Sequence, residues 1–197
     1  MKPYSESCEQ NRIPILEVLN KELVDAGSLL EIGSGTGQHA VYFAPHFPNL
    51  YWQTSDLEAN HYGIKQWLTE VKLPNILDPL HLDVNSSNWP TTQFEFVYSA
   101  NTAHIMSWPM VNNMLEQIGK LLKPNGKFCL YGPFNYNGKY TSESNERFDQ
   151  WLKDRDVKSG IRDFEALNKV TQLVGLRLSK DYEMPANNRL LVWLKEC

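Results

Sequence analysis

Cysteine and long apolar runs are scarce in this chain of 197 residues. The three cysteines, Cys8, Cys129 and Cys197, form no Cys-x-x-Cys pair, so the sequence indicates neither a disulfide framework nor a zinc site. No apolar run approaches the roughly 20 residues that a membrane span needs, and residues 1–11 lack the apolar core of a signal peptide. We therefore expect a reduced, cytoplasmic protein without a bound metal and without a membrane anchor.

An excess of positive charge is also missing. Lys and Arg number 19 against 23 Asp and Glu, which gives a formal net charge of −4. Proteins that bind nucleic acids or anionic membranes usually present a basic face, so we expect neither partner. The 42% of hydrophobic residues is typical of a globular chain, and the length fits a single domain covering residues 1–197.

Short apolar runs alternate with helical stretches over most of the chain. Strands are predicted at 28–32, 50–54, 80–83, 94–99 and 126–131, and helices at 11–26 (with Pro14 near its start), 38–44, 58–71 and 109–122. This alternation predicts an α/β fold, a three-layer sandwich with a mostly parallel sheet covered by helices on both faces.

The end of the chain breaks this alternation. Two strand-like runs, 176–183 and 189–194, are joined by too few residues for a parallel crossover, so an antiparallel hairpin should complete a seven-stranded sheet. The preceding residues, 133–175, are too long and polar for a plain crossover. We predict an insertion with helices at 144–155 and 163–173 and a loop that covers the working edge of the sheet like a lid.

The clearest motif is a glycine turn between a strand and a helix, in residues 29–39. Glycines allow a sharp turn and a close approach to a ligand. The third glycine, Gly37, comes one position too early for the dinucleotide pattern G-x-G-x-x-G, and no Lys-Ser or Lys-Thr follows as in a phosphate loop. Glu31, two positions before Gly33, favours a cation or a hydrogen-bond donor over a phosphate.

The pattern E-x-G-x-G-x-G resembles motif I of the class I S-adenosylmethionine-dependent methyltransferases. Asp56 and Asp83 stand at the ends of the second and third predicted strands. An acid after the second strand suits ribose hydroxyls, and the resemblance implies that Asp83 contacts the adenine amino group. Either residue alone would be read as a solvated turn carboxylate or a helix cap. The ligand is expected at the carboxyl ends of the strands.

A wider resemblance covers nearly the whole chain. Residues 7–16, 31–45, 140–145, 160–163 and 184–188 are similar to the family known as domain of unknown function 938, whose animal relatives are called methyltransferase-like 26. This implies a class I methyltransferase fold and S-adenosylmethionine as the cofactor. The expected cofactor-binding residues are Arg12, Glu31, Gly33, Ser34, Gly35, Thr36, Gly37, His39, Asp56, Leu57, Asp83, Val84 and Asn101.

Three residues are candidates for proton transfer, which methyl transfer needs only if the acceptor must lose a proton. His104 lies in the segment after the fourth strand that faces the substrate in this family, and Tyr136 and Glu143 lie in or beside the predicted lid loop. Arg12 could pair with the carboxylate of the cofactor or, alternatively, with Glu9.

The sequence also narrows the acceptor. The Asn/Asp-Pro-Pro-Tyr/Phe signature and the Pro-Cys motif of nucleic-acid methyltransferases are absent, which favours a small-molecule acceptor. Two alternatives stay open. One is a non-catalytic protein that keeps the fold and binds S-adenosylmethionine, and the other is a variant NAD or nucleotide-sugar enzyme.

Aromatic residues are plentiful, at 12% of the chain. Those on predicted strands should pack in the core: Trp52, Tyr98, Tyr131 and Trp193. Another group falls in segments expected around the methyl end of the cofactor: Tyr4, Trp108, Tyr136, Tyr140 and Trp151. We predict that this second group forms an aromatic wall for a flat acceptor.

Overall fold

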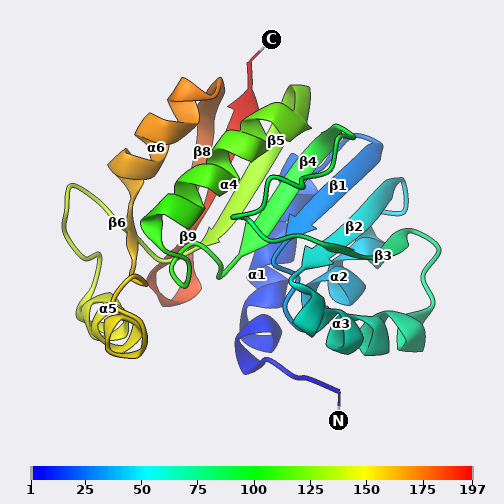
Figure 1. Cartoon of the computed structure of the whole chain (residues 1–197), viewed down its shortest axis with the longest axis horizontal. Helices are drawn as coiled ribbons and strands as arrows, with labels where there is room; N and C mark the ends of the chain where they lie inside the picture. The colour runs from blue at the N-terminus through cyan, green and yellow to red at the C-terminus, as the bar shows by residue number, and fades with distance from the viewer. Residues whose placement is uncertain (1, 197) are drawn as a thin grey trace.

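The computed structural model describes residues 2–196, so Met1 and Cys197 lie outside the described part of the chain. Figure 1 shows one central sheet with helices on either side. The elements in chain order are α1 (Glu6–Glu22), β1 (Gly27–Ile32), α2 (Gln38–Phe43), the 3-10 helix η1 (Ala44–His46), β2 (Leu50–Asp56), α3 (Glu58–Val71), β3 (Ile76–His81), β4 (Phe94–Ala100), α4 (Trp108–Leu121), β5 (Leu122–Gly132), β6 (Phe134–Asn135), α5 (Glu143–Arg155), β7 (Arg162–Asp163), α6 (Phe164–Leu173), β8 (Leu176–Met184), the 3-10 helix η2 (Pro185–Asn187) and β9 (Asn188–Lys195).

The sheet has seven strands in the order β3-β2-β1-β4-β5-β9-β8. The first five run parallel, while β9 is antiparallel to both β5 and β8. The predicted parallel sheet with a terminal antiparallel hairpin is confirmed. Because β2 and β4 lie on opposite sides of β1, the chain reverses its direction of travel there, and this leaves a crevice at the carboxyl ends of the strands.

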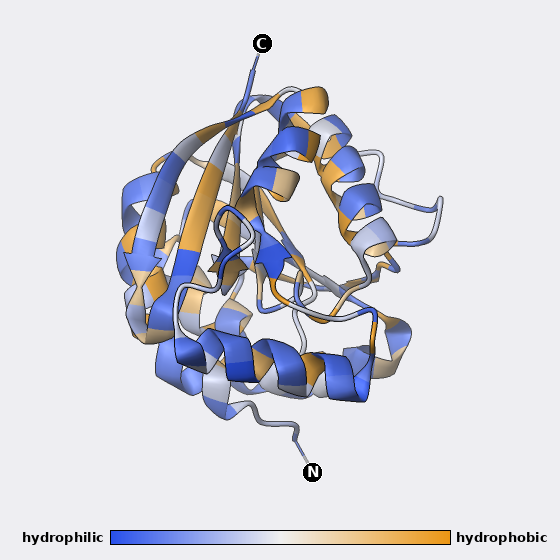
Figure 2. Cartoon of the chain, turned by 90° about the vertical axis from the view of Figure 1, so that its left-hand side faces the viewer, coloured by the Kyte–Doolittle hydropathy of each residue, from blue (hydrophilic) through white to orange (hydrophobic). Residues whose placement is uncertain are grey.

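The inner strands of the sheet are buried on both faces, whereas the edge strands β3 and β8 are largely exposed. Successive strand residues point to opposite faces, so Leu29 packs with α1 and α2 while Leu30 packs with α4. The predicted core aromatics Trp52, Tyr98 and Trp193 are fully buried, and Tyr131 is 4% exposed. Figure 2 shows the apolar strands enclosed by helices whose outer faces are hydrophilic. Within residues 2–196, no helix is long and apolar enough to cross a membrane.

The first helix begins earlier than predicted. It starts at Glu6, because the Ser5 hydroxyl caps it by accepting from the Cys8 amide at 3.4 Å. Pro14 therefore lies inside the helix and not near its start, which leaves the Gln10 carbonyl without its usual donor. The predicted end at residue 26 was also wrong, since the helix ends at Glu22. The early start matters, because it places residues 3–8 beside the glycine turn.

Two strands also differ from the prediction. β3 covers Ile76–His81 instead of 80–83, so Asp83 follows the strand by two residues. The last pairing of β3 joins His81 to Asp56, and the chain then turns into the crevice. β5 begins at Leu122, directly after α4, with an irregular register against β4. Period-two patterns predict the central part of a strand well, but pairing partners decide its ends.

The predicted insertion contains both expected helices, α5 and α6. It also contains a two-stranded parallel ladder, β6–β7, that the sequence did not reveal. α6 packs against α4 and contributes the buried Leu167 to the core. α5 stands apart from the sheet, as Figure 1 shows, whereas Phe134 of β6 is part of the core.

Candidate ligand site

A cavity of about 840 Å³ opens at the carboxyl ends of β1, β2 and β4. Its walls come from the glycine turn after β1, the start of α3, the loops after β3 and β4, and the segment before α1. This size is typical of sites for small molecules or cofactors. It lies in the crevice that the topology of the sheet predicts.

The glycine turn forms the floor of this cavity. Gly33 has φ +73°, and a Cβ there would lie 2.6 Å from Thr102 Cγ2, so the turn packs closely on the loop after β4. Gly35 has φ +57°, and a Cβ there would meet no atom within 4 Å. Because Gly35 lines the cavity, a side chain at this position would project into ligand space.

Glu31 is hydrogen-bonded to the glycine turn on the side away from the cavity. Its carboxylate accepts hydrogen bonds from Trp52 Nε1 and from Ser34 Oγ, both at 3.0 Å. Burial, together with the negative charge of Asp56, raises the pKa of Glu31 to about 7. The carboxyl group does not line the cavity itself, but Ser34 does. Glu31 is therefore one hydrogen bond away from the ligand space and can change its charge near neutral pH.

Two carboxylates line the cavity. Asp56 accepts from the amides of Gly35 and Leu57 and from Asn60 Nδ2, each at 2.7 Å. A carboxylate offers about four acceptor positions, so Asp56 keeps about one for a ligand. Asp83 accepts from the Asn85 amide at 2.8 Å and has more capacity left. Both can bind hydroxyl or amino groups.

The described lining of the cavity offers no cationic side chain to balance these acids. Among its described lining residues there is no Lys or Arg. The lining residue His39 is buried in a network with Asn11 Oδ1 at 2.7 Å and the Tyr98 hydroxyl at 3.3 Å. Burial lowers its pKa to about 4, so the imidazole is neutral at physiological pH. The site therefore suits a cation or a polyhydroxyl ligand and is unfavourable for phosphates.

Most of the predicted cofactor residues meet in this cavity. Its walls include Gly33, Ser34, Gly35, Thr36, His39, Asp56, Leu57, Asp83, Val84 and Asn101. Gly37 lies behind the turn against Ile64, as the N-cap of α2. Arg12 does not line the cavity, and instead pairs with Glu9 and lies 4.4 Å over the Tyr42 ring. The structure thus shows the alternative role that the sequence left open for Arg12.

The three predicted proton-transfer residues lie outside the cavity lining. The Tyr136 ring stacks on Phe164, and its hydroxyl donates to Asp181 at 2.8 Å. Glu143 is exposed at the start of α5. The His104 ring packs against Phe148, 5.3 Å between centroids. The loop after β6 therefore packs against β8 and α6, because its polar groups find partners there, and it does not cover the cavity.

The predicted aromatic wall is also wrong. None of its five members is among the described lining residues, and Trp151 is 50% exposed, stacked on Phe148. The apolar part of the cavity is formed mainly by aliphatic and thioether side chains. These are Ile32, Leu57, Leu82, Val84, Ile105, Met106 and Met110.

Sequence reasoning also missed one wall of the site. Pro3, Ser5, Ser7 and Cys8 line the cavity from the segment that leads into α1. The Ser5 amide donates to Gln38 Oε1 at 2.5 Å, and Trp67 Nε1 donates to the Pro3 carbonyl at 2.7 Å. The signal that could have found this wall is Ser5 as a helix N-cap, since an earlier helix start places its N-terminal end at the glycine turn.

His104 is expected to limit stability in acid. Burial, together with the charge of Arg162, lowers its pKa to about 4. Because the pKa is 6.5 in the unfolded chain and about 4 in the folded protein, the free energy of unfolding is highest above pH 6.5 and decreases as the pH falls towards 4. We expect His104→Leu to flatten the decrease in Tm between pH 6.5 and 4. His46, which is exposed, is the matched control, and an equal effect of His46→Leu would contradict the role of burial.

Comparison with known proteins identifies the family. The family described as "Protein of unknown function (DUF938)" matches residues 2–195. The chain belongs to this family. The DUF938 chain thus carries the family pattern through every element described above, from the segment before the glycine turn to the antiparallel hairpin.

Solved structures show the fold of the DUF938 chain. An O-methyltransferase family protein from Burkholderia thailandensis superimposes with a TM-score of 0.83 at 13% identity, over 93% of this chain and 56% of that one. Human N-acetylserotonin methyltransferase in complex with S-adenosylmethionine gives a TM-score of 0.80 at 15% identity, over 98% of this chain and 53% of that one. The YcgJ protein of Bacillus subtilis gives 0.73 at 14% identity, over 92% and 98%.

The DUF938 chain therefore spans about half the length of the first two proteins and nearly all of the third. At these identities the similarity establishes the fold. It is the Rossmann-like α/β fold of class I S-adenosylmethionine-dependent methyltransferases.

Proposed function

We propose that the chain binds S-adenosylmethionine in the cavity beside the glycine turn and transfers its methyl group to a small-molecule acceptor. One observation carries this proposal. The cavity combines two carboxylates, Asp56 and Asp83, with a described lining that has no Lys or Arg. S-adenosylmethionine carries a sulfonium, an ammonium, hydroxyls and an amino group, and it has no phosphate.

The residues present fit this cofactor. Asp56, with about one acceptor position left, would receive a ribose hydroxyl, and Asp83 would receive the adenine amino group. The apolar side chains of Val84 and Met110 offer surfaces for the flat base. When bound, the cofactor supplies an electrophilic methyl group on a positively charged sulfur. The chain contributes binding, orientation and exclusion of water.

The protein's own contribution to the reaction is therefore mainly geometric. Cys8 and His39 are titratable groups of the lining that could meet an acceptor. The thiol pKa of Cys8 is raised by burial, and His39 is engaged by Asn11 and Tyr98. An acceptor that already has a free lone pair at neutral pH needs no base. We propose such an acceptor, and we expect neither nucleic acid nor membrane as a partner.

A second function is favoured by one specific observation. His104, Tyr136 and Glu143 all lie outside the cavity lining, so the chain could bind the cofactor without catalysis. An NAD or nucleotide-sugar enzyme is disfavoured, because its phosphates would face Asp56 and Asp83 with no cation among the described lining residues.

Calorimetry followed by a transfer assay tests these alternatives. We expect S-adenosylmethionine and S-adenosylhomocysteine to bind and NAD to give no heat; binding of NAD alone would refute the proposal. Radiolabelled S-adenosylmethionine is then incubated with a metabolite extract. Label in a small-molecule product that depends on the protein supports the methyltransferase, and binding without any transfer supports the non-catalytic alternative.

A further inference from the structure

The turn after β4, Ala103–Met106, has an unusual set of partners. Each of its four consecutive backbone carbonyls accepts a hydrogen bond from residues 159–162. Arg162 Nε donates to the Ala103 carbonyl at 3.0 Å, and the Gly160 amide donates to that of His104 at 2.8 Å. Ser159 Oγ donates to the Ile105 carbonyl at 3.0 Å, and Arg162 Nη2 donates to that of Met106.

This turn is a wall of the cavity. The side chains of Ile105 and Met106 line it, as does Thr102 just before the turn. Thr102 also packs on the glycine turn, since a Cβ on Gly33 would meet its methyl group. A shift of the Ala103–Met106 turn would therefore change both the shape of the cavity and the packing of the glycine turn.

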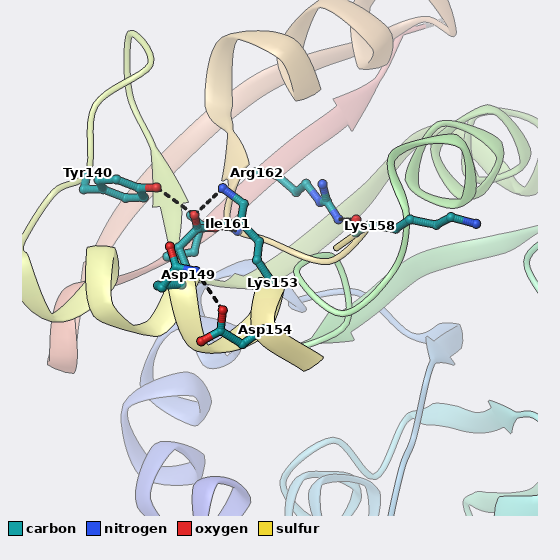
Figure 3. A network of polar contacts seen from close by, with 8 residues as sticks. Tyr140, Asp149, Lys153, Asp154, Lys158, Ile161 and Arg162 are labelled. Atoms are coloured by element: carbon teal, nitrogen blue, oxygen red, sulfur yellow. Dashed lines mark hydrogen bonds and ion pairs between the residues drawn. The ribbon is translucent and has the colours of Figure 1, made fainter. Parts of the chain in front are cut away.

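The segment 159–162 is itself held by a buried carboxylate. Asp149 of α5, which is 2% exposed, accepts from the Ile161 amide at 2.6 Å. Its other oxygen accepts from the Tyr140 hydroxyl at 2.7 Å and from Lys153 Nζ at 2.6 Å. Figure 3 shows these groups converging on Asp149, with Arg162 directed away from it.

Three family-like sequence segments meet in this network. Residues 140–145 contribute Tyr140 and Asn145, and residues 160–163 contribute Arg162. Asn145 Nδ2 donates to the Asn187 carbonyl at 3.1 Å, which connects residues 184–188. The cofactor site does not use these segments directly. Of these segments, Tyr140 reaches residues 159–162 through Asp149, and residues 159–162 bond directly to the turn after β4.

Arg162 is the central donor of this arrangement. Burial lowers the pKa of its guanidinium, which donates to the carbonyls of Ala103, Met106 and Lys158, the last at 2.9 Å. A planar guanidinium can donate along several fixed directions at once, whereas an ammonium cannot match that geometry. Placing a partly desolvated cation here has a cost, which points to a demand for accurate positioning of the turn.

We propose that Arg162 is a positioning residue of the ligand site: through the Ala103–Met106 turn it sets the wall of the cavity and thereby the affinity for the bound molecule. This inference rests on the proposed function, because the ligand used to read it out is S-adenosylmethionine.

Calorimetry on Arg162→Lys provides the test. At a temperature where the variants are fully folded by circular dichroism, we expect about tenfold weaker binding of S-adenosylmethionine, the equivalent of about one hydrogen bond. Arg189→Lys is the matched control. Arg189 Nε on β9 donates to Asp181 Oδ1 on β8 at 2.7 Å, away from the turn. Its replacement by Lys should leave the affinity for S-adenosylmethionine unchanged. An Arg162→Lys variant with lower Tm and wild-type affinity would overturn the proposal and leave Arg162 a purely structural residue.

A measurement without ligand separates this inference from the proposed function. Hydrogen exchange at the amides of Asn101, Ile105 and Met106 should accelerate in Arg162→Lys and stay unchanged in Arg189→Lys. If the wild type does not bind S-adenosylmethionine, the proposed function fails, and faster exchange still supports the positioning role; unchanged exchange refutes it. Should Arg162→Lys not fold, Ser159→Ala removes only the bond to Ile105 and should show the same effects at smaller size.

Discussion

Gly35→Val is expected to abolish binding of S-adenosylmethionine, with a loss of about 100-fold or more, equivalent to about 3 kcal/mol. Gly35 lines the cavity, and its Cβ position has no protein atom within 4 Å. The branched side chain would therefore occupy ligand space without a clash that prevents folding. Calorimetry measures the affinity, and circular dichroism verifies the fold.

The cost of backbone strain has a matched control in the same chain. A non-glycine residue at positive φ costs on the order of 1–3 kcal/mol, which applies to Gly35 at +57°. Gly138 has φ +69° and also has no atom within 4 Å of a Cβ, but it lies outside the cavity lining. Gly138→Val should lower Tm by a similar amount and leave affinity intact. Unchanged affinity in Gly35→Val would show that the turn does not contact the ligand.

The second large effect is a pH dependence of binding that originates in Glu31. Its pKa of about 7 means that the carboxyl group is about half ionised at neutral pH in the free protein. A cationic ligand in the adjacent cavity favours the ionised form, so binding should release a proton and affinity should rise with pH. We expect the affinity for S-adenosylmethionine to increase close to tenfold between pH 6 and 8.

Glu31→Gln should remove this dependence, because the amide keeps the shape of the side chain but carries no charge. S-adenosylhomocysteine is the matched ligand, since it lacks the sulfonium charge and should show a smaller pH effect on the wild type. Calorimetry at pH 6, 7 and 8 makes the comparison. A pH dependence that persists in Glu31→Gln would originate in another group and would refute the role of Glu31.

The stability of the free protein gives an independent check of the sign. The pKa of Glu31 is raised in the folded state, from 4.5 to about 7, so the folded state holds the proton more tightly than the unfolded chain. This contribution is fully present below pH 4.5 and is lost as the pH rises through 7, by up to about 3 kcal/mol. Glu31→Gln should therefore raise Tm relative to the wild type at pH 8 more than at pH 5.

Local patterns predicted the central parts of the fold and of the site. The glycine spacing from Gly33 to Gly37, together with Glu31, pointed to a ligand without phosphate, and the cavity has a matching set of polar groups. The hairpin after residue 175 could be recognised because its short connection allows only antiparallel pairing. These features depend on neighbours in the chain, which a sequence displays directly.

Side-chain direction could not be predicted in the same way. Tyr136 and Tyr140 follow a strand end and were expected near the ligand, but their hydroxyls bind Asp181 and Asp149. These pairs join residues from different elements, so no local spacing marks them. Similarly, Arg12 pairs with Glu9 and lies over the Tyr42 ring, so it does not line the cavity.

The scarcity of positive charge is a property of the sequence as a whole, but its consequence depends on placement. Composition alone gave no reason to expect a basic surface, and the absence of a nucleic-acid partner stays a prediction. Only the tertiary structure decided that none of the chain's Lys or Arg residues is among the described cavity-lining residues. It also decided that Arg162 donates to the carbonyls of the Ala103–Met106 turn and does not line the cavity. The physical reason is that a cation's effect on a ligand depends on distance and on burial, and long-range packing sets both.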